Sequence, residues 1–467
     1  MPENRRPRRR KSGMNIAFPL ILIGLAVLIL LFVGIVALVK QLAPNETTAA
    51  SIPQSTASVP ATTISTQPPT TVPATEPPVH KVSTATIGST GDILMHDKVR
   101  ESGYDPATGT YNYDSIFTYF SQYASKVDYA VANLEVTLCS DDNGYEYKGY
   151  PCFNSTDAIV DALKNAGFDM LLTANNHSYD TGTKGFKRTQ EVIMDRNLAY
   201  TGTRYQEADK NYLVQDINGI KVGMICYTYN TGSSNGSISL NGAPLSAADS
   251  KLINSFNYWS LDSFYSKLSV EMEQMKAEGA EAIMLYLHWG DEWQTTENSN
   301  QRKMAQDLCD MGIDVIVGNH AHVPQPVELL TSTTDEKQKT LCLYSMGNSV
   351  HNIFGSKYPK QTEDGMLFSV TFAKYSDGTV VLESADVLPT WVYRYYENDV
   401  RKYVVLTMDA DDRDNWQASM NLTDEILQNC INSYDRTMAI VGEGLEEANA
   451  YYAQNQKDVE AQIGIKN

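Results

Sequence analysis

Short apolar runs rich in β-branched residues alternate with longer amphipathic stretches from about Val82 onward. The short runs predict strands, and the stretches between them, several of which end at a glycine, predict helices. This alternation is typical of an α/β fold in which helices cover a largely buried sheet. The predicted strands are residues 82–88, 127–135, 168–174, 220–228, 280–288, 313–318 and 339–347, and the predicted helices are residues 155–167, 184–197, 261–279 and 299–312.

The carboxyl-terminal part of the sequence follows a different pattern. Residues 365–390 hold two apolar stretches around a Ser-Asp-Gly turn, which predicts an antiparallel hairpin. From Asp411 onward the sequence is acidic and helical in pattern, without a chemical signature. We therefore expect a globular domain over residues 82–395 and a helical extension over residues 396–467.

The first 80 residues divide into three segments of different composition. Residues 1–14 are rich in arginine, residues 15–39 carry no charged side chain, and residues 40–80 are rich in Thr, Pro and Ser. The uncharged run exceeds the roughly 20 residues that cross a bilayer, and its basic flank predicts a cytoplasmic amino terminus. A cleaved signal sequence is the alternative. We expect one transmembrane helix, followed by a disordered stalk that holds the domain outside the cell.

The net charge and the missing motifs exclude several classes of function. The chain carries a formal charge of −19, and its first twelve residues contribute five Arg, one Lys and one Glu, or +5, which leaves −24 for the rest. A body this acidic is a poor nucleic-acid binder. The sequence has no phosphate-binding G-x-x-x-x-G-K-[ST] loop and no G-x-S-x-G elbow. Any ATP-driven polymerisation must therefore take place in a partner, and a serine hydrolase is disfavoured.

Polar residues that can bind metals follow five of the predicted strands. In open α/β sheets, ligands bind at the carboxyl ends of the strands. A buried cluster of carboxylates and imidazoles would repel itself and stay unsatisfied without a cation, so the pattern predicts a metal centre with ligands enough for two ions. Because no cysteine belongs to the cluster, a structural zinc site is disfavoured. The residues are Asp92 with His96, Glu135, Asn175 with Asn176 and His177, His288, and His320 with His322.

Two of these histidines are separated by a single residue, in the stretch GNHAHVPQPVE at residues 318–328. Residues i and i+2 of a strand point to the same face, so His320 and His322 would face one spot if the extended geometry of the preceding strand continued. A pair of ordinary surface-loop histidines is the alternative.

The motifs GDILMH, NLE, TANNHSYDTG, HWGDEW, GNHAHVPQPVE and YSMGNSV occur in this order along the chain. Together they resemble the CapA (poly-γ-glutamate capsule biosynthesis) family, a branch of the calcineurin-like metallophosphatase superfamily. The resemblance covers roughly residues 82–375. It implies a sandwich of two β-sheets flanked by helices, with a dinuclear metal site.

The resemblance also implies roles for single residues, with two divalent ions such as Mn, Fe or Zn. Glu135 stands at the metal-bridging position, and His177 matches the histidine that protonates a leaving group. His96, four residues after the first ligand where the superfamily has a spacing of two, joins Asp180 as a candidate ligand or a residue that orients one. Trp289 and Trp293 are candidate walls of a substrate groove, with core packing as the alternative for at least one. The implied metal ligands are Asp92, Glu135, Asn176, His288, His320 and His322.

These residue types would support hydrolysis of a phosphoester. Two cations would activate a water and clamp a phosphoryl oxygen, while His177 protonates the departing oxygen. We therefore expect a membrane-anchored, outward-facing protein that assists synthesis, export or attachment of an anionic capsule polymer together with polymer synthase subunits. One alternative is an extracellular phosphoesterase with another substrate. The other is a subunit that binds the polymer without catalysis.

The cysteines fall into two kinds of environment. Cys226, Cys309 and Cys342 lie within apolar patterns and predict buried thiols. Cys139 and Cys152 bracket a polar loop after Glu135, in a compartment that permits oxidation, and predict a disulfide beside the site. Two free thiols in this loop are the alternative.

Overall fold

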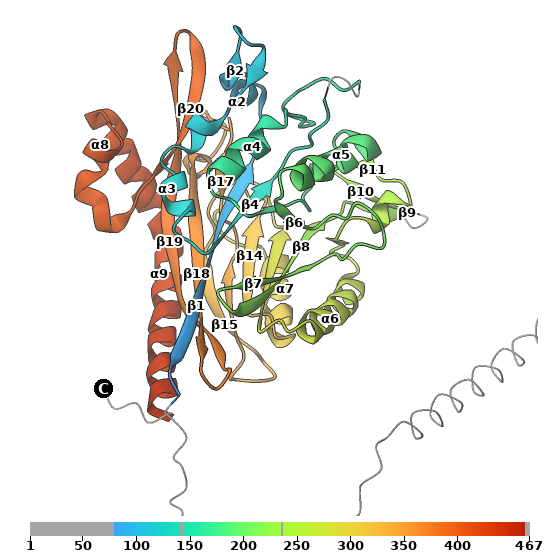
Figure 1. Cartoon of the computed structure of the whole chain (residues 1–467), viewed down its shortest axis with the longest axis vertical. Coiled ribbons are helices and arrows are strands. Elements are labelled where there is room, and N and C mark those ends of the chain that lie inside the picture. Colours follow the sequence, from blue (N-terminus) through green and yellow to red (C-terminus); the bar gives the residue numbers. More distant parts are fainter. Residues whose placement is uncertain (1–78, 141–143, 235–236, 463–467) are drawn as a thin grey trace, which may run out of the picture. The chain divides into compact units, whose positions relative to one another are not determined.

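A computed structural model of the chain describes residues 79–140, 144–234 and 237–462 (Figure 1). The predicted tail, the predicted membrane span and all but the end of the predicted stalk lie outside these residues. Within the described ranges, no helix combines the length and apolarity needed to cross a membrane. Each predicted strand and helix of the domain overlaps an observed one, so the mixed α/β prediction is confirmed.

The first sheet is mixed and has the order β20-β19-β18-β1-β4-β5-β6, with β17 paired to β1. Strands β1, β4, β5, β6 and β17 run parallel, and β18, β19 and β20 add antiparallel neighbours on one side. The strands are β1 (Lys81–Ile93), β4 (Tyr129–Leu134), β5 (Met170–Leu172), β6 (Ala199–Thr201), β17 (Asn348–Val350), β18 (Asp364–Tyr375), β19 (Val380–Glu397) and β20 (Val400–Thr407).

The second sheet has the order β12-β8-β13-β14-β16-β15, with β7 paired to β8. Strands β12, β8, β13, β14 and β16 are parallel, whereas β7 and β15 run antiparallel to their neighbours. The strands are β7 (Leu213–Ile217), β8 (Ile220–Tyr229), β12 (Ser255–Phe256), β13 (Ala282–His288), β14 (Val315–Asn319), β15 (Val327–Thr331) and β16 (Lys339–Leu343).

The two sheets pack face to face around one apolar core. Ile87 and Val131 of the first sheet share this core with Met224 and Met284 of the second. The Ser89 Oγ and Tyr286 Oη atoms, 3.1 Å apart, join β1 to β13 across it. Because both faces of each sheet are covered, the central parallel strands are almost continuously apolar.

Helices cover the outer faces of both sheets (Figure 1). Val99, Ile159 and Val192 pack α2, α4 and α5 against the first sheet. Leu268 and Leu308 do the same for α6 and α7 on the second sheet. The helices are α2 (Asp97–Ser102), α3 (Ser121–Ala124), α4 (Ala158–Asn165), α5 (Gly182–Asp195), α6 (Leu261–Ala277) and α7 (Ser299–Asp310). Short elements connect them, namely β2 (Tyr104–Asp105), β3 (Thr110–Tyr111), η1 (Asp114–Phe117), β9 (Ser233–Ser234), β10 (Ser237–Leu240), β11 (Ala243–Pro244), η3 (Asp249–Lys251) and η4 (Lys360–Glu363).

The predicted helical extension over residues 396–467 begins too early. Strand β20 pairs with β19 and extends the first sheet before η5 (Ala410–Asn415), α8 (Trp416–Ser419) and α9 (Asp424–Gln462) follow. Tyr403, Val405 and Leu406 of β20 are buried, which explains why this segment forms a strand. The long helix α9 lies along β19 (Figure 1) and contacts β15 of the other sheet.

Buried polar contacts fix α9 against the sandwich. The Arg436 guanidinium pairs with the buried carboxylate of Asp364, which also accepts a hydrogen bond of 2.6 Å from the Ser433 hydroxyl. The Asn449 side chain exchanges two hydrogen bonds with the Ala385 backbone, at 3.0 and 2.8 Å. The extension is therefore part of the folded domain.

Candidate metal centre

The predicted ligands lie where the parallel strands of both sheets end. Asp92 on β1 is in register with Asn133 on β4 and with Asn348 on β17. His288 on β13 is in register with Asn319 on β14. The carboxyl ends of the two sheets therefore bring polar side chains to one buried place.

Two glycines allow the backbone to approach closely at this place. A Cβ atom on Gly91 would lie 1.9 Å from the carbonyl oxygen of Gly347, and one on Gly318 would lie 1.8 Å from that of Tyr344. The Asp92 N–H donates to the same Gly347 oxygen at 3.1 Å. The glycines of GDILMH and GNHAH are thus required by packing, because any side chain there would push the ligand strands apart.

Two groups of three ligands form among the described residues. Glu135 and His288 join His320 in one group, and Glu135 joins Asp92 and His322 in the other, with the ligand atoms of each group within 4.8 Å of one another. Glu135 belongs to both groups. The Asn176 Oδ1 atom lies 2.9 Å from His288 Nε2 and adds an amide oxygen beside the first group. The structure therefore brings together all six residues that the sequence predicts as ligands.

Glu135 has the properties of a metal ligand. Its side chain is fully buried, and neither carboxylate oxygen forms a hydrogen bond. Nε2 of His288 lies 3.5 Å from Oε1 without bonding to it. Burial, followed by the negative charge of Asp92, raises the pKa of Glu135 well above its usual value. A buried polar group without a partner is costly, and a divalent cation would supply the partner that the fold does not.

Asp92, His288 and His320 are in the protonation states that metals need. Burial would lower the pKa of His322, but the hydrogen bond to Asp92 and the charge of that carboxylate raise it overall, so a metal ion would have to displace a proton from this ring. Burial opposes ionisation of Asp92, but hydrogen bonding to His322 and the charge of that imidazole lower the Asp92 pKa overall. Burial lowers the pKa of His288 to about 3 and also lowers that of His320, whose Nδ1 has no hydrogen-bond partner. A carboxylate with the neutral imidazoles of His288 and His320 suits divalent metals such as Mn, Fe or Zn. The residues present therefore fit divalent metal ions.

Neighbouring amides hold the ligands in place. Asn133 Nδ2 donates to Asp92 Oδ1 at 2.7 Å. The Nδ1 atom of His322 lies 3.0 Å from Asp92 Oδ2 and 3.1 Å from Asn348 Oδ1. The backbone N–H of His320 donates to Asp92 Oδ2 at 3.2 Å. These contacts fix the orientation of the rings, as supporting residues commonly do around metals.

His320 and His322 both reach the metal centre, but the extended geometry from which this was predicted does not continue. Strand β14 ends at Asn319, and both histidines adopt left-handed backbone angles, with φ of +91° and +57°. Their rings are 6.1 Å apart between centroids, and each belongs to a different ligand group. The extended geometry does not continue because the chain turns at this point.

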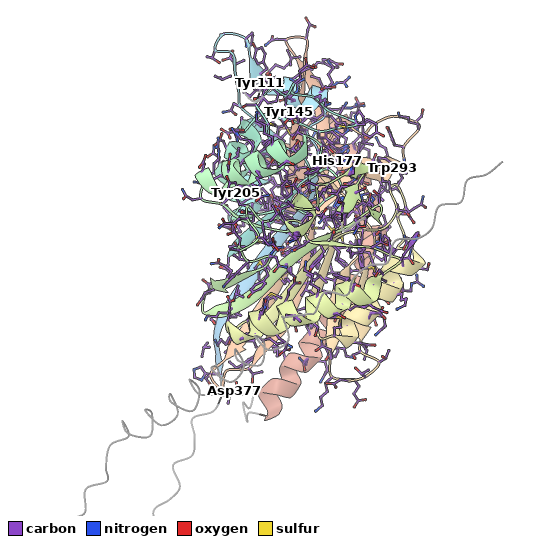
Figure 2. All side chains as sticks on the ribbon, turned by 90° about the vertical axis from the view of Figure 1, so that its right-hand side faces the viewer. Tyr111, Tyr145, His177, Tyr205, Trp293 and Asp377 are labelled. Atoms are coloured by element: carbon purple, nitrogen blue, oxygen red, sulfur yellow. The ribbon has the colours of Figure 1, made fainter. Side chains whose placement is uncertain are left out.

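A small cavity opens beside the second ligand group. It has a volume of about 280 Å³, and His96, His177, Trp293 and His322 are among the residues that line it. Figure 2 shows His177 and Trp293 close together, below Tyr111 and Tyr145. His96 Nδ1 accepts a hydrogen bond of 3.3 Å from the Asn352 N–H, and His96 belongs to neither ligand group. His96 therefore forms part of the wall.

Asp180 orients His177 and belongs to neither ligand group. Its Oδ2 atom lies 2.7 Å from His177 Nδ1 and accepts a hydrogen bond of 2.5 Å from the Phe153 N–H. The Phe153 ring packs edge-on against His177 at 4.7 Å between centroids. The carboxylate favours a proton on Nδ1 of His177 and leaves Nε2 for a substrate.

The two tryptophans have different surroundings. Trp293 lines the small cavity, with its ring 5.4 Å from that of His322. Trp289 is fully buried, stacks on Tyr344 at 5.9 Å and donates a hydrogen bond of 3.0 Å to the Tyr344 carbonyl. Trp289 therefore belongs to the core, and its assignment to a substrate wall is wrong.

The predicted disulfide between Cys139 and Cys152 is absent, since the structure describes both residues as free thiols. The loop is held instead by Asn154, whose side chain accepts from the Cys139 N–H and donates to the Cys139 carbonyl, both at 2.8 Å. Because this pair of amide hydrogen bonds already fixes the loop to the end of the strand, no covalent bond is needed to position it.

A second, larger cavity of about 630 Å³ opens beside the first ligand group. Tyr229, Tyr258, Trp259, Glu292 and His320 are among the residues that line it. Glu292 also lines the small cavity and was missed by the sequence analysis, as was Asn133. A signal for Asn133 was present, because it lies two residues before Glu135 near the end of the same strand.

Comparisons with known proteins agree with the motifs. Residues 86–353 match the family described as "Bacterial capsule synthesis protein PGA_cap". The chain is similar to "Capsule biosynthesis protein CapA" of Bacillus anthracis, with 29% identity over 314 residues, which are 65% of this chain and 66% of the relative. It is also similar to "PGA biosynthesis protein CapA" of Bacillus subtilis (strain 168), with 27% identity over 263 residues, 56% of this chain and 61% of the relative.

Both alignments span slightly less than two thirds of the relatives' own length. Among solved structures, the crystal structure of the protein TT1561 of Thermus thermophilus matches with 6% identity and a TM-score of 0.32, over 61% of this chain and 94% of that chain. The family match covers more than half of the 467 residues and includes both ligand groups. The chain therefore belongs to the bacterial capsule synthesis family PGA_cap, the family of the CapA proteins.

Proposed function

We propose that the chain is a metal-dependent phosphoester hydrolase that serves capsule polymer synthesis at the outer face of the cell membrane. Glu135 carries this proposal, because it belongs to both ligand groups and its two buried oxygens have no hydrogen-bond partner. One carboxylate shared by two groups is the arrangement expected of a dinuclear site of the calcineurin-like metallophosphatase type.

Each ion would be held by its own group. Glu135, His288 and His320, with Asn176 beside them, would hold one, and Asp92, Glu135 and His322 would hold the other. Divalent ions in such a site supply Lewis acidity toward a phosphoryl oxygen and make water more acidic.

His177 is the residue proposed to move a proton. It lines the small cavity, and its contact with Asp180 holds the imidazole in one orientation. A proton on Nε2 would then pass to the oxygen of the leaving group. This pair favours a hydrolase over a subunit that only binds polymer, because binding alone needs no oriented proton donor.

The relatives' names, which refer to capsule and PGA biosynthesis, support the polymer as the biological context. We propose a phosphoester of the anionic polymer or of its precursor as substrate, and polymer synthase subunits as partners. Nucleic acid is not a proposed substrate, since the body is strongly acidic.

Membrane attachment is proposed from the sequence alone. Residues 15–39 would cross the membrane with residues 1–14 in the cytoplasm, and residues 40–80 would space the domain from the outer surface. Protease added to intact cells should then remove the domain. Survival of the domain on intact cells, with digestion only after lysis, would show that this topology is wrong.

The function is tested with the full chain after chelation and reloading with Mn, Fe or Zn. Phosphomonoesters and phosphodiesters should be hydrolysed only by the reloaded chain, and Glu135→Gln should abolish turnover. Glu101→Gln is the matched control, because Glu101 is exposed on α2 and forms an ion pair with the exposed Lys98. Turnover that survives chelation or the Glu135→Gln change would contradict the proposal. Metal binding without turnover of any ester would favour the polymer-binding subunit.

A further inference from the structure

We propose that the larger cavity beside His320 binds a neutral sugar ring, which makes sugar-containing phosphate esters the substrate class. The second part of this inference rests on the proposed hydrolase function, whereas the binding of the sugar ring does not. The cavity has a volume of about 630 Å³, and no reaction step described above uses it except through His320.

Aromatic side chains form the walls of this cavity. Trp259 is 84% exposed, the highest value among the exposed large hydrophobic residues in the described part of the chain. An indole with this exposure, on the wall of a cavity, is accessible for stacking on a ligand. Tyr229, whose ring lies 4.9 Å from that of His320, and Tyr258 line the same space. Flat rings of this kind stack against the C–H face of a pyranose ring and offer a polar edge to its hydroxyls.

Oriented amides add the polar part of the cavity. Asn257 Nδ2 donates to Asn230 Oδ1 at 2.9 Å, and Asn257 Oδ1 accepts from the backbone N–H of Trp259 at 2.9 Å. These bonds fix the direction of both amide planes and tie Trp259 to them. Each amide nitrogen carries two N–H groups, so donors remain for a ligand. A hydroxyl group, which both donates and accepts, matches amides beside carboxylates.

The negative charge on the wall of the larger cavity favours a neutral ligand over an anionic one. None of the described residues that line it is a lysine or an arginine, whereas Asp291 and Glu292 are exposed on its wall. Carboxylates at this position would repel a polyglutamate segment or the additional phosphates of a nucleotide. The small cavity on the other side of the centre has Lys357 as well as Glu292 on its wall, and this cation makes it the better place for an anionic group.

The cavity also lies where a substrate would need it. His320 belongs to a ligand group and to the cavity wall, and Glu292 lines both cavities. A sugar stacked on Trp259 would therefore lie beside the place where a phosphoryl group meets the metal centre. One end of the substrate would be neutral and hydroxylated, and the other would be accepted near His177.

Binding is measured by calorimetry on the full, metal-loaded chain with two neutral probes, maltotriose and the N-acetylglucosamine trisaccharide. A poly-γ-glutamate oligomer is the anionic probe. At least one neutral probe should bind, and Trp259→Ala and Asn257→Ala should each raise its Kd by about tenfold, the effect of roughly 1.4 kcal/mol. Tyr396→Ala, at an aromatic side chain that is 67% exposed and lines a different cavity, is the matched control and should leave Kd unchanged.

Several outcomes would overturn the assignment. They are failure of both neutral probes to bind, an unchanged Kd in Trp259→Ala, or tighter binding of polyglutamate than of the sugars. Hydrolysis of bis(p-nitrophenyl) phosphate is followed in parallel. Sugar binding without hydrolysis would refute the hydrolase and keep the cavity assignment, whereas hydrolysis without sugar binding would refute the cavity assignment alone.

Discussion

Replacing Glu135 with Gln should make the metal-free chain more stable at neutral pH. The carboxyl group is fully buried, and burial together with the charge of Asp92 raises its pKa well above the usual value. A group whose pKa is higher in the folded state than in the unfolded state stabilises the fold below the unfolded-state pKa. This stabilisation is lost as the pH rises toward the folded-state pKa. For an unfolded pKa of about 4.3 and a pH of about 7, keeping the proton in place costs at most about 4 kcal/mol.

Glutamine removes this cost because it has no proton to lose. The amide and the protonated carboxyl each bury polar atoms without partners, so the penalties of lost hydrogen bonds largely cancel. The metal-free Glu135→Gln chain should therefore exceed the parent in free energy of unfolding at pH 7, by up to about 4 kcal/mol, and should approach the parent near pH 4. With metal the order should reverse, because the parent gains about 2.7 kcal/mol for each ion present at a hundredfold excess over its Kd.

The assay is urea unfolding of the full chain, followed by circular dichroism, at pH 4 and pH 7 with chelator and with added metal. Glu101→Gln, on the exposed face of α2, should follow the parent under all four conditions. A metal-free Glu135→Gln chain less stable than the parent at pH 7 would refute the reasoning. An undiminished stabilisation of the variant by metal would refute it too.

Metal content, turnover and pH-dependent stability provide three further predictions. His320→Ala and His322→Ala should each reduce bound metal from two ions to one by elemental analysis, since they belong to different ligand groups; full occupancy in both would exclude them as ligands. His177→Ala should keep its metal yet lose turnover by about 10²–10⁴-fold in steady-state kinetics, and loss of metal would show that it is a ligand. Burial raises the pKa of Asp314 to about 6, so the parent should lose roughly 2 kcal/mol of stability as the pH rises from about 4 to about 6. Asp314→Asn, which keeps an acceptor for the Ile283 N–H, should not show this loss in urea unfolding, and an unchanged pH profile would contradict the assignment.

Periodicity was sufficient to predict the elements that position the site. The β-branched runs and the polar residue after each one placed Asp92, Glu135 and His288 at the carboxyl ends of parallel strands, where the structure has them. This works because strand geometry is regular, so a residue's place in the run decides its place at the sheet edge. The roles within the cluster came from the resemblance to a family, since residue type alone does not distinguish a ligand from a proton donor.

Features that depend on loop torsions or on tertiary contacts were not predictable in this way. The left-handed turn at His320 and His322 follows from contacts with Asp92, which is more than 200 residues away in sequence. The spacing of Cys139 and Cys152 gives no information about the direction of their side chains, and direction decides whether a disulfide can form. The core position of Trp289 could have been predicted. It directly follows His288, and neighbouring residues of a strand face opposite sides, so Trp289 points away from the ligands.

Several unfavourable features of this fold coincide at the candidate metal centre. Left-handed backbone at Trp293, His320 and His322 costs on the order of 1–3 kcal/mol for each residue, and Glu135 adds a buried carboxyl without partners. Their sum is comparable to the whole stability of a typical domain, about 5–15 kcal/mol, so the surrounding packing must offset it. The Gln301 side chain, which accepts from the Asn298 N–H at α7 and donates to Gln325 beyond the histidine turn, is one such support. Strain and unpaired polar groups that gather at one site, within strands that otherwise follow the rules of packing, are expected where ligand binding requires that geometry. A cation shared through Glu135 would remove the largest of these costs, which is why we expect metal and folding to be coupled in this chain.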